Sequence, residues 1–194
     1  MTLLDLKIFM AGLRLKMFKV GVNFLGSFAL GDEINKDLKM LKFLYNLKMG
    51  KEENNSLIKI KIILIASICE AILYDFINTR ISMYTQEGVG SLDKENLIEI
   101  RDKDYKKFSH YIDAAAKYEF FSNNKLCKKL EDLRKFRNCI HIQNFCILSD
   151  NSLIQAEEVM ELFLNEMAKH DRPGHLSGHV QDFEIPFNRR KAVK

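Results

Sequence analysis

The stretch that most constrains the fold is a long apolar run, "IKIILIASICEAILYDFI", at residues 60–77. Lys61, Glu70 and Asp75 interrupt it, whereas a membrane-spanning helix needs about 20 apolar residues with few charges. We therefore interpret the run as the centre of a buried helix over about 57–84. Because this helix is apolar nearly all round, it must be covered on both sides, by the domain core or by a partner chain.

Helical periodicity recurs on both sides of this run. Asp32 is the expected N-cap of a helix over about 33–48, and Ser56 that of the central helix, after a short polar loop, "KEENN". In the first of these helices the core positions are expected to be Ile34, Leu38, Leu41 and Tyr45, and the other helices to lie at about 92–102, 105–121, 124–141 and 152–170. No strand pattern is convincing. The sequence predicts an all-α fold, an up-and-down bundle of four to five main helices.

The 194 residues allow one domain. Residues 1–31 combine an amphipathic stretch with Gly21, Gly26 and Gly31, which break it, and are expected to form an amino-terminal helix or arm. Residues 32–170 should form the bundle. Residues 171–194 are polar and broken by proline and glycine, so we expect a flexible tail there.

Charge and cysteine content limit the partners, the cellular compartment and the metals that we expect for this chain. The net charge is +4 and the pI is about 8.8, which suits contact with nucleic acid but is weaker than in dedicated DNA-binding proteins. The absence of CxxC pairs and of a signal peptide predicts a cytoplasmic protein without a membrane partner. Cys139, His141 and Cys146 match no common zinc spacing. Neither a metal nor a cofactor is expected.

The segment "EDLRKFRNCIHIQN", residues 131–144, carries the candidate chemistry. At about 100° per residue, a helix here places one set of side chains in a narrow arc that faces the core: Leu126, Leu130, Leu133 and Ile140. A second set falls in an adjacent arc roughly 100° wide, at the border with solvent: Arg134, Arg137, Asn138 and His141.

These residue types suit the handling of phosphate. Arginine offers planar paired donors to phosphate oxygens, and histidine can exchange a proton near neutral pH. A base that deprotonates the 2′-hydroxyl of RNA, together with cations that stabilise the phosphorane, can cleave the strand without metal. The structural alternative is that the cations merely favour a helix C-terminus, and that His141 bonds the last carbonyl groups.

Two stretches resemble the HEPN superfamily of all-α domains. "LRKFRNCIHIQ", residues 133–143, is similar to the segment in which four to six residues separate an arginine from a following histidine. "IILIASICEAILYDFI", residues 62–77, resembles the long helix that carries a glutamate, which here is Glu70. "YIDAAAKYEFF", residues 111–121, is similar to the helix that usually precedes the signature. The resemblance covers about residues 57–170.

The resemblance implies a function as well as a fold. Many HEPN domains are metal-independent endoribonucleases of bacterial toxin–antitoxin and other defence systems, and they pair as homodimers with the arginine and histidine at the shared cleft. Others are non-catalytic modules that bind RNA, nucleotides or proteins. We therefore expect an RNA-cleaving homodimer, silenced in some systems by an antitoxin protein, with a non-catalytic RNA- or nucleotide-binding or dimerisation module as the alternative.

Residue by residue, the resemblance implies that His141 is the catalytic histidine. The arginine is either Arg137, which is followed by Asn138 but has three residues before His141, or Arg134, which has six. Glu70 either approaches the same cleft or is a charge at the dimer seam that a lysine or arginine neutralises.

Overall fold

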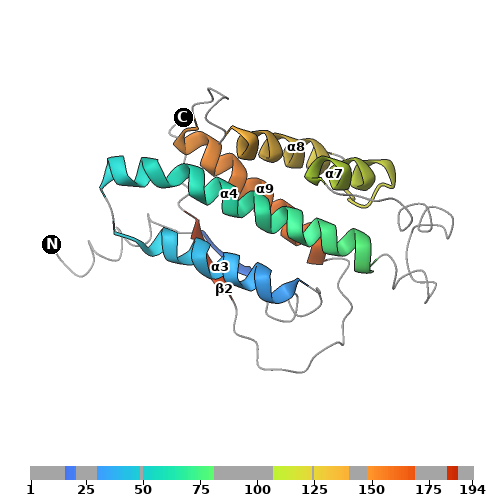
Figure 1. Ribbon diagram of the computed structural model, residues 1–194, viewed down its shortest axis with the longest axis horizontal. Helices are drawn as coiled ribbons and strands as arrows, with labels where there is room; N and C mark the ends of the chain where they lie inside the picture. Colours follow the sequence, from blue (N-terminus) through green and yellow to red (C-terminus); the bar gives the residue numbers. More distant parts are fainter. Residues whose placement is uncertain are drawn as a thin grey trace, which may run out of the picture.

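The computed structural model describes residues 16–20, 30–48, 50–80, 107–123, 125–139, 148–168 and 183–187. Within these ranges the chain forms five α-helices and one pair of short strands, which confirms the predicted all-α bundle (Figure 1). The helices are α3 (Gly31–Asn46), α4 (Lys51–Asp75), α7 (Phe108–Lys117), α8 (Lys125–Asn138) and α9 (Asp150–Ala168).

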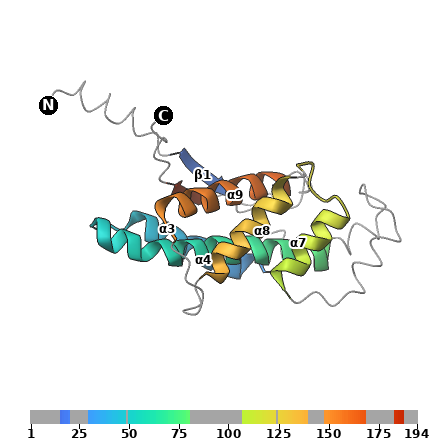
Figure 2. The same cartoon turned by 90° about the horizontal axis from the view of Figure 1, so that it is seen from above.

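Helix α4 is the centre of the bundle and contacts the four other helices. Helix α3 lies on one side of α4 and the α7–α8 pair on the other (Figure 1). Helix α9 crosses α4 on a third side, as the view from above shows (Figure 2). A π-helical turn, η1 (Phe76–Arg80), continues α4 at its carboxyl end.

The core forms between α4 and its neighbours because each helix turns one apolar face inward. The four positions expected on α3 are all buried, which confirms that periodicity. Phe163 of α9 is fully buried, and its ring meets the ring of Phe121 edge to face at a centroid distance of 6.0 Å. The largest buried side chains include Leu38, Leu41, Ile62, Ile65, Ile72 and Leu73.

Helix α3 begins earlier than its sequence indicates. It starts at Gly31, so Asp32 lies inside the first turn and is not the N-cap. The cap comes instead from another helix, because a carboxylate oxygen of Asp75 accepts the backbone N–H of Leu30 at 2.9 Å. Asp75 is buried beside the positive end of the α3 dipole, where a carboxylate is favourable.

Helix α4 also begins earlier than predicted. It starts at Lys51, so the expected loop "KEENN" is its first turn, and Ser56 lies within the helix. The carboxylate of Glu53 accepts the N–H of Gly50 at 2.7 Å, and the hydroxyl of Ser56 donates to the carbonyl of Glu52 at 3.2 Å. Glutamates in a first turn satisfy free N–H groups and complement the helix dipole, which explains the early start.

Helix α7 ends in a turn that usually contains glycine. The N–H of Phe120 donates to the carbonyl of Ala115 at 3.1 Å, and the N–H of Glu119 to that of Ala116 at 3.4 Å. This pattern is a Schellman motif, with Glu119 at the left-handed position and a φ of 51°. A glutamate there is strained because its Cβ crowds the backbone.

A buried polar cluster joins three helices at one end of the bundle. The hydroxyl of Tyr45, on α3, donates a short hydrogen bond to Glu157, on α9. Lys61 of α4 lies with Nζ 4.6 Å from the Tyr45 ring centroid and 3.1 Å from the side-chain oxygen of Asn54. Burial lowers the pKa of Lys61, and the negative charge of Glu157 partly restores it.

Two short strands that the sequence did not predict pair across the chain. β1 (Lys16–Val20) and β2 (Phe183–Phe187) are antiparallel, with Lys16 opposite Phe187 and Val20 opposite Phe183. β2 contacts α3. The pair therefore joins segments from the predicted amino-terminal arm and carboxyl-terminal tail.

Candidate functional site

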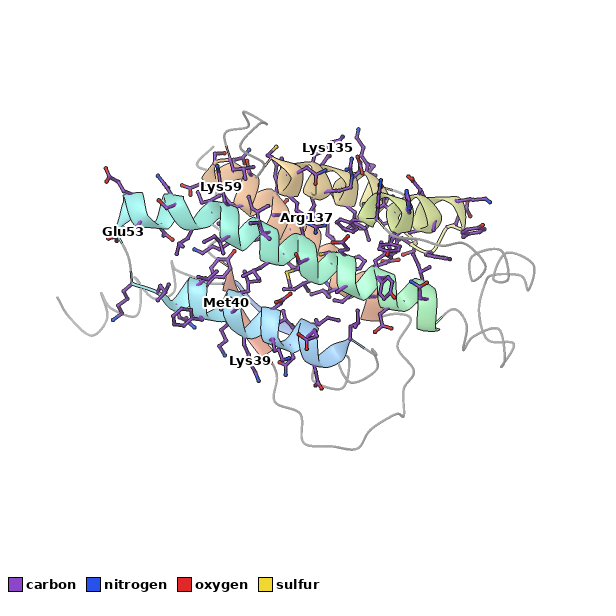
Figure 3. All side chains as sticks on the ribbon, viewed as in Figure 1. Lys39, Met40, Glu53, Lys59, Lys135 and Arg137 are labelled. Carbon is purple, nitrogen blue, oxygen red and sulfur yellow. The ribbon has the colours of Figure 1, made fainter. Side chains whose placement is uncertain are left out.

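Helix α8 sets the positions of the candidate residues through its buried face. Leu126, Leu130 and Leu133 are buried, as the spacing predicted, and fix the rotation of the helix against its neighbours. Arg134, Arg137 and Asn138 follow in the last turn and a half. Arg137 lies on the side of α8 that faces α4, whereas Lys135 points to the opposite side (Figure 3).

The structure brings Arg137 and Glu70 together. Nη1 of Arg137 donates a short hydrogen bond to a carboxylate oxygen of Glu70, which lies on α4 and 67 residues earlier in the chain. The Arg137 side chain is 36% exposed and that of Glu70 is 24% exposed. The pair therefore lies at the border between core and solvent, where an ion pair contributes about 1 kcal/mol or less.

Arg134 has a different partner on its own helix. Its Nε and Nη2 donate to the two carboxylate oxygens of Glu131, at 2.7 and 2.6 Å. These hydrogen bonds hold the pKa of Glu131 below its ordinary value and raise that of Arg134. The spacing of three residues is a known signal for a helical ion pair, so this contact was visible in the sequence although it was not singled out.

Of the other predicted site residues, the structure describes some and not others. Asn138 is exposed and is the last residue of α8. His141 and Cys146 lie outside the described residues. Cys139 is disulfide-bonded, whereas Cys69 and Cys127 have free thiols whose pKa values are raised by burial. No group of three His, Cys, Asp or Glu side chains in the described part of the chain is arranged to hold a metal ion.

Charge is concentrated on α8. This helix has six lysines and arginines against two carboxylates, a net charge of +4 that equals that of the whole chain. Helix α9, which packs against it, has five carboxylates and no lysine or arginine. The solvent side of α8 is therefore a basic surface, although near its carboxyl end Arg134, Lys135 and Arg137 each pair with a carboxylate.

The geometry at this end suits an anion better than a neutral ligand. Arg137 donates one hydrogen bond to the described residues, from Nη1, and its Nε and Nη2 have no partner among them. Arg134 uses both ends of its planar fork on Glu131. Of the two candidate arginines, Arg137 is thus the one with donors available for a phosphate.

None of the described helices is long and apolar enough to cross a membrane. The chain matches no family model, no curated protein and no solved structure. Its likeness to HEPN domains therefore rests on the residues of the two quoted stretches and of the helix between them.

Proposed function

We propose that the chain is a HEPN-like endoribonuclease that acts as a homodimer, in a bacterial defence or toxin–antitoxin setting. The observation that supports this most is the placement of Arg137, which Glu70 holds at the solvent border of α4 and α8. A guanidinium fixed in this way, at the end of a basic helix, is suited to contact a phosphate of RNA.

The cleavage step uses groups that RNA and this segment supply. His141 accepts the proton of the 2′-hydroxyl, and the 2′-oxygen attacks the adjacent phosphorus. Arg137 stabilises the charge that develops on the phosphorane, and Asn138 orients the phosphate. The bond to the 5′-oxygen then breaks, and that oxygen takes up a proton. The products are a 2′,3′-cyclic phosphate and a 5′-hydroxyl.

An exposed face of α4 supports pairing with a second copy. Ile60 and Tyr74 are 44% and 39% exposed although they lie on the central helix. Together with the partly buried residues between them they form a stripe at spacings of four, three, four and three, as in a coiled-coil seam: Ile60, Leu64, Ser67, Ala71 and Tyr74. Ser67 and Ala71 are small, so two such helices can approach closely. Glu70 borders this stripe, so pairing would bring two copies of the site together.

One observation favours the non-catalytic alternative, in which the domain binds RNA or nucleotides, or pairs, without cleavage. Both arginines already have carboxylate partners, Glu131 for Arg134 and Glu70 for Arg137. These carboxylates reduce the positive charge that is available to bind a substrate. An antitoxin protein that covers the same surface would suit either function.

An assay with labelled RNA in EDTA tests the proposal. Wild type is compared with His141→Ala, Arg137→Ala and, as a matched control, Lys39→Ala, which removes an exposed cation from α3, away from the candidate site. We expect cleavage by wild type and the control, and a loss of about 100-fold or more in the other two. Equal cleavage by all four proteins would indicate a contaminating nuclease, and binding without cleavage would support the non-catalytic module.

The proposed pairing has its own test. Light scattering after size exclusion should give the mass of a dimer for wild type and of a monomer for Ala71→Arg, because a bulky charge in the middle of the stripe prevents close approach. Lys39→Glu, on the exposed side of α3, is the control and should leave the mass unchanged. If wild type is a monomer, the proposal that two copies of the chain share one site is wrong.

A further inference from the structure

The ion pair between Arg137 and Glu70 differs in kind from the pair between Arg134 and Glu131. Arg134 and Glu131 are three residues apart on one helix, so their contact forms wherever α8 forms. Arg137 and Glu70 come from α8 and α4, so their contact depends on the packing of the bundle. Of the two pairs, only the pair of Arg137 and Glu70 occupies an arginine donor on the side of α8 that faces α4.

The position of Glu70 also decides which N–H groups of Arg137 remain for a phosphate. A phosphate is bound most tightly when two parallel N–H groups of one guanidinium reach two of its oxygens. Glu70 takes Nη1 of Arg137, which blocks the Nη1–Nη2 edge of the guanidinium but leaves the Nε–Nη2 edge without a partner among the described residues. A phosphate that approaches Arg137 also meets the negative charge of this carboxylate at close range.

We infer that Glu70 is an intramolecular competitor for the phosphate site, a carboxylate that RNA must displace from Arg137 before it binds fully. This inference rests on the proposed function, since it describes how the same site is regulated. Both side chains are partly exposed, so the contact is weak enough to exchange with a ligand.

The consequence is that the site should bind a single phosphate weakly and a strand of several phosphates more tightly. A single phosphate at the Nε–Nη2 edge gains little because the negative charge of Glu70 lies close to it, whereas a strand whose neighbouring phosphates contact the lysines of α8 gains more. Glu70 thus favours polyanions over free phosphate. Glu70→Gln removes the competing charge while keeping the shape of the side chain.

The test compares wild type with Glu70→Gln and Glu33→Gln. The second variant is the matched control, because it makes the same change of charge at an exposed ion pair of α3, Glu33 with Lys36, away from the candidate site. Two probes are titrated at about 50 mM salt, where surface charges are weakly screened: inorganic pyrophosphate by calorimetry, and a fluorescent single-stranded oligoribonucleotide by anisotropy. Thermal unfolding of each protein checks that the variants remain folded.

A third readout follows Arg137 without any ligand. Phenylglyoxal modifies guanidinium groups that are free of partners, and peptide mass spectrometry separates the rate at Arg137 from that at Arg134. We expect Glu70→Gln to raise the rate at Arg137 and to tighten pyrophosphate binding by about fivefold, the upper range for an exposed ion pair. RNA should bind more tightly too, but by a smaller factor. Glu33→Gln should leave pyrophosphate binding and the Arg137 rate unchanged.

The outcomes separate this inference from the function on which it rests. RNA binding by wild type with equal or weaker binding by Glu70→Gln would retain the function and overturn the competition, since Glu70 would then only orient Arg137. Tighter pyrophosphate binding without any RNA binding would retain the competition and remove the RNA function. Equal gains in both variants would overturn the competition as general electrostatics, and no binding of either probe would overturn both.

Discussion

The hydrogen bond between Tyr45 and Glu157 gives a sharp test of how the bundle is held together. It joins α3 to α9 across 112 residues, and the two side chains are 9% and 1% exposed. Tyr45→Phe removes the hydroxyl and keeps the ring. Hydrogen bonds to charged groups contribute about 1.5–3 kcal/mol, and a buried carboxylate that loses a donor adds to the cost. We expect the free energy of unfolding to fall by about 2–4 kcal/mol.

A double-mutant cycle isolates this contact from its surroundings. Urea unfolding, followed by circular dichroism, is measured for Tyr45→Phe, Glu157→Met and the double variant, and the coupling energy should be about 1.5–3 kcal/mol. Glu157→Met alone should cost more than Tyr45→Phe, because it also removes the larger of the two negative charges, Glu157 and Asp150, that favour the charged form of the buried Lys61. Tyr74→Phe is the control; its ring is partly exposed, and the change should stay within about 0.5 kcal/mol.

The same contact predicts a dependence on pH. Burial, and then the negative charge of Glu157, raise the pKa of Tyr45 far above its ordinary value. Above pH of about 10 the unfolded chain releases this proton while the folded chain keeps it, so stability falls by about 1.4 kcal/mol per pH unit. The difference in stability between wild type and Tyr45→Phe should therefore shrink from pH 10 to 11. A coupling energy below about 0.5 kcal/mol, with parallel pH profiles, would refute the reasoning.

Three further substitutions test separate parts of the fold by urea unfolding. Asp75→Ala should cost about 1–3 kcal/mol because it removes the only described acceptor of the Leu30 N–H, whereas Asp75→Asn should cost less; equal effects would contradict the capping role. Glu119→Gly should raise the stability by about 1 kcal/mol by relieving the left-handed backbone, and a loss would show that the glutamate has a compensating contact. Leu133→Ala should cost about 2–5 kcal/mol, and a change below 1 kcal/mol would mean that α8 is not anchored by this face.

The sequence predicted the helices well because α3, α7, α8 and α9 each have a one-sided apolar face and α4 is apolar nearly all round. It failed at the start of α3 because the contact that caps this helix is not local. The carboxylate that caps α3 comes from Asp75, which lies 45 residues after the N–H that it accepts. Asp32 looked like a cap from its type and position alone. The strands were missed for the same reason, since each has five residues and its partner is at the other end of the chain.

The candidate site was predictable in its residue types but not in its pairing. The helical arc correctly placed Leu133 in the core and put Arg134 and Arg137 beside it. Nothing in the spacing showed that Arg137 would reach Glu70 while Arg134 turned to Glu131. That difference depends on how α4 and α8 cross, which is a property of the packed bundle. His141 lies outside the described residues, and its role stays a prediction.

The register of the β1–β2 pair has a mechanical consequence. Lys16 and Phe187, the outermost residues of the two strands, lie opposite each other. A force that pulls the two ends apart therefore acts on one rung of the ladder at a time and unzips the strands, instead of shearing all the rungs together. An unfoldase that pulls one end while the other is held would meet little resistance there, and its load would pass next to α3, which β2 contacts.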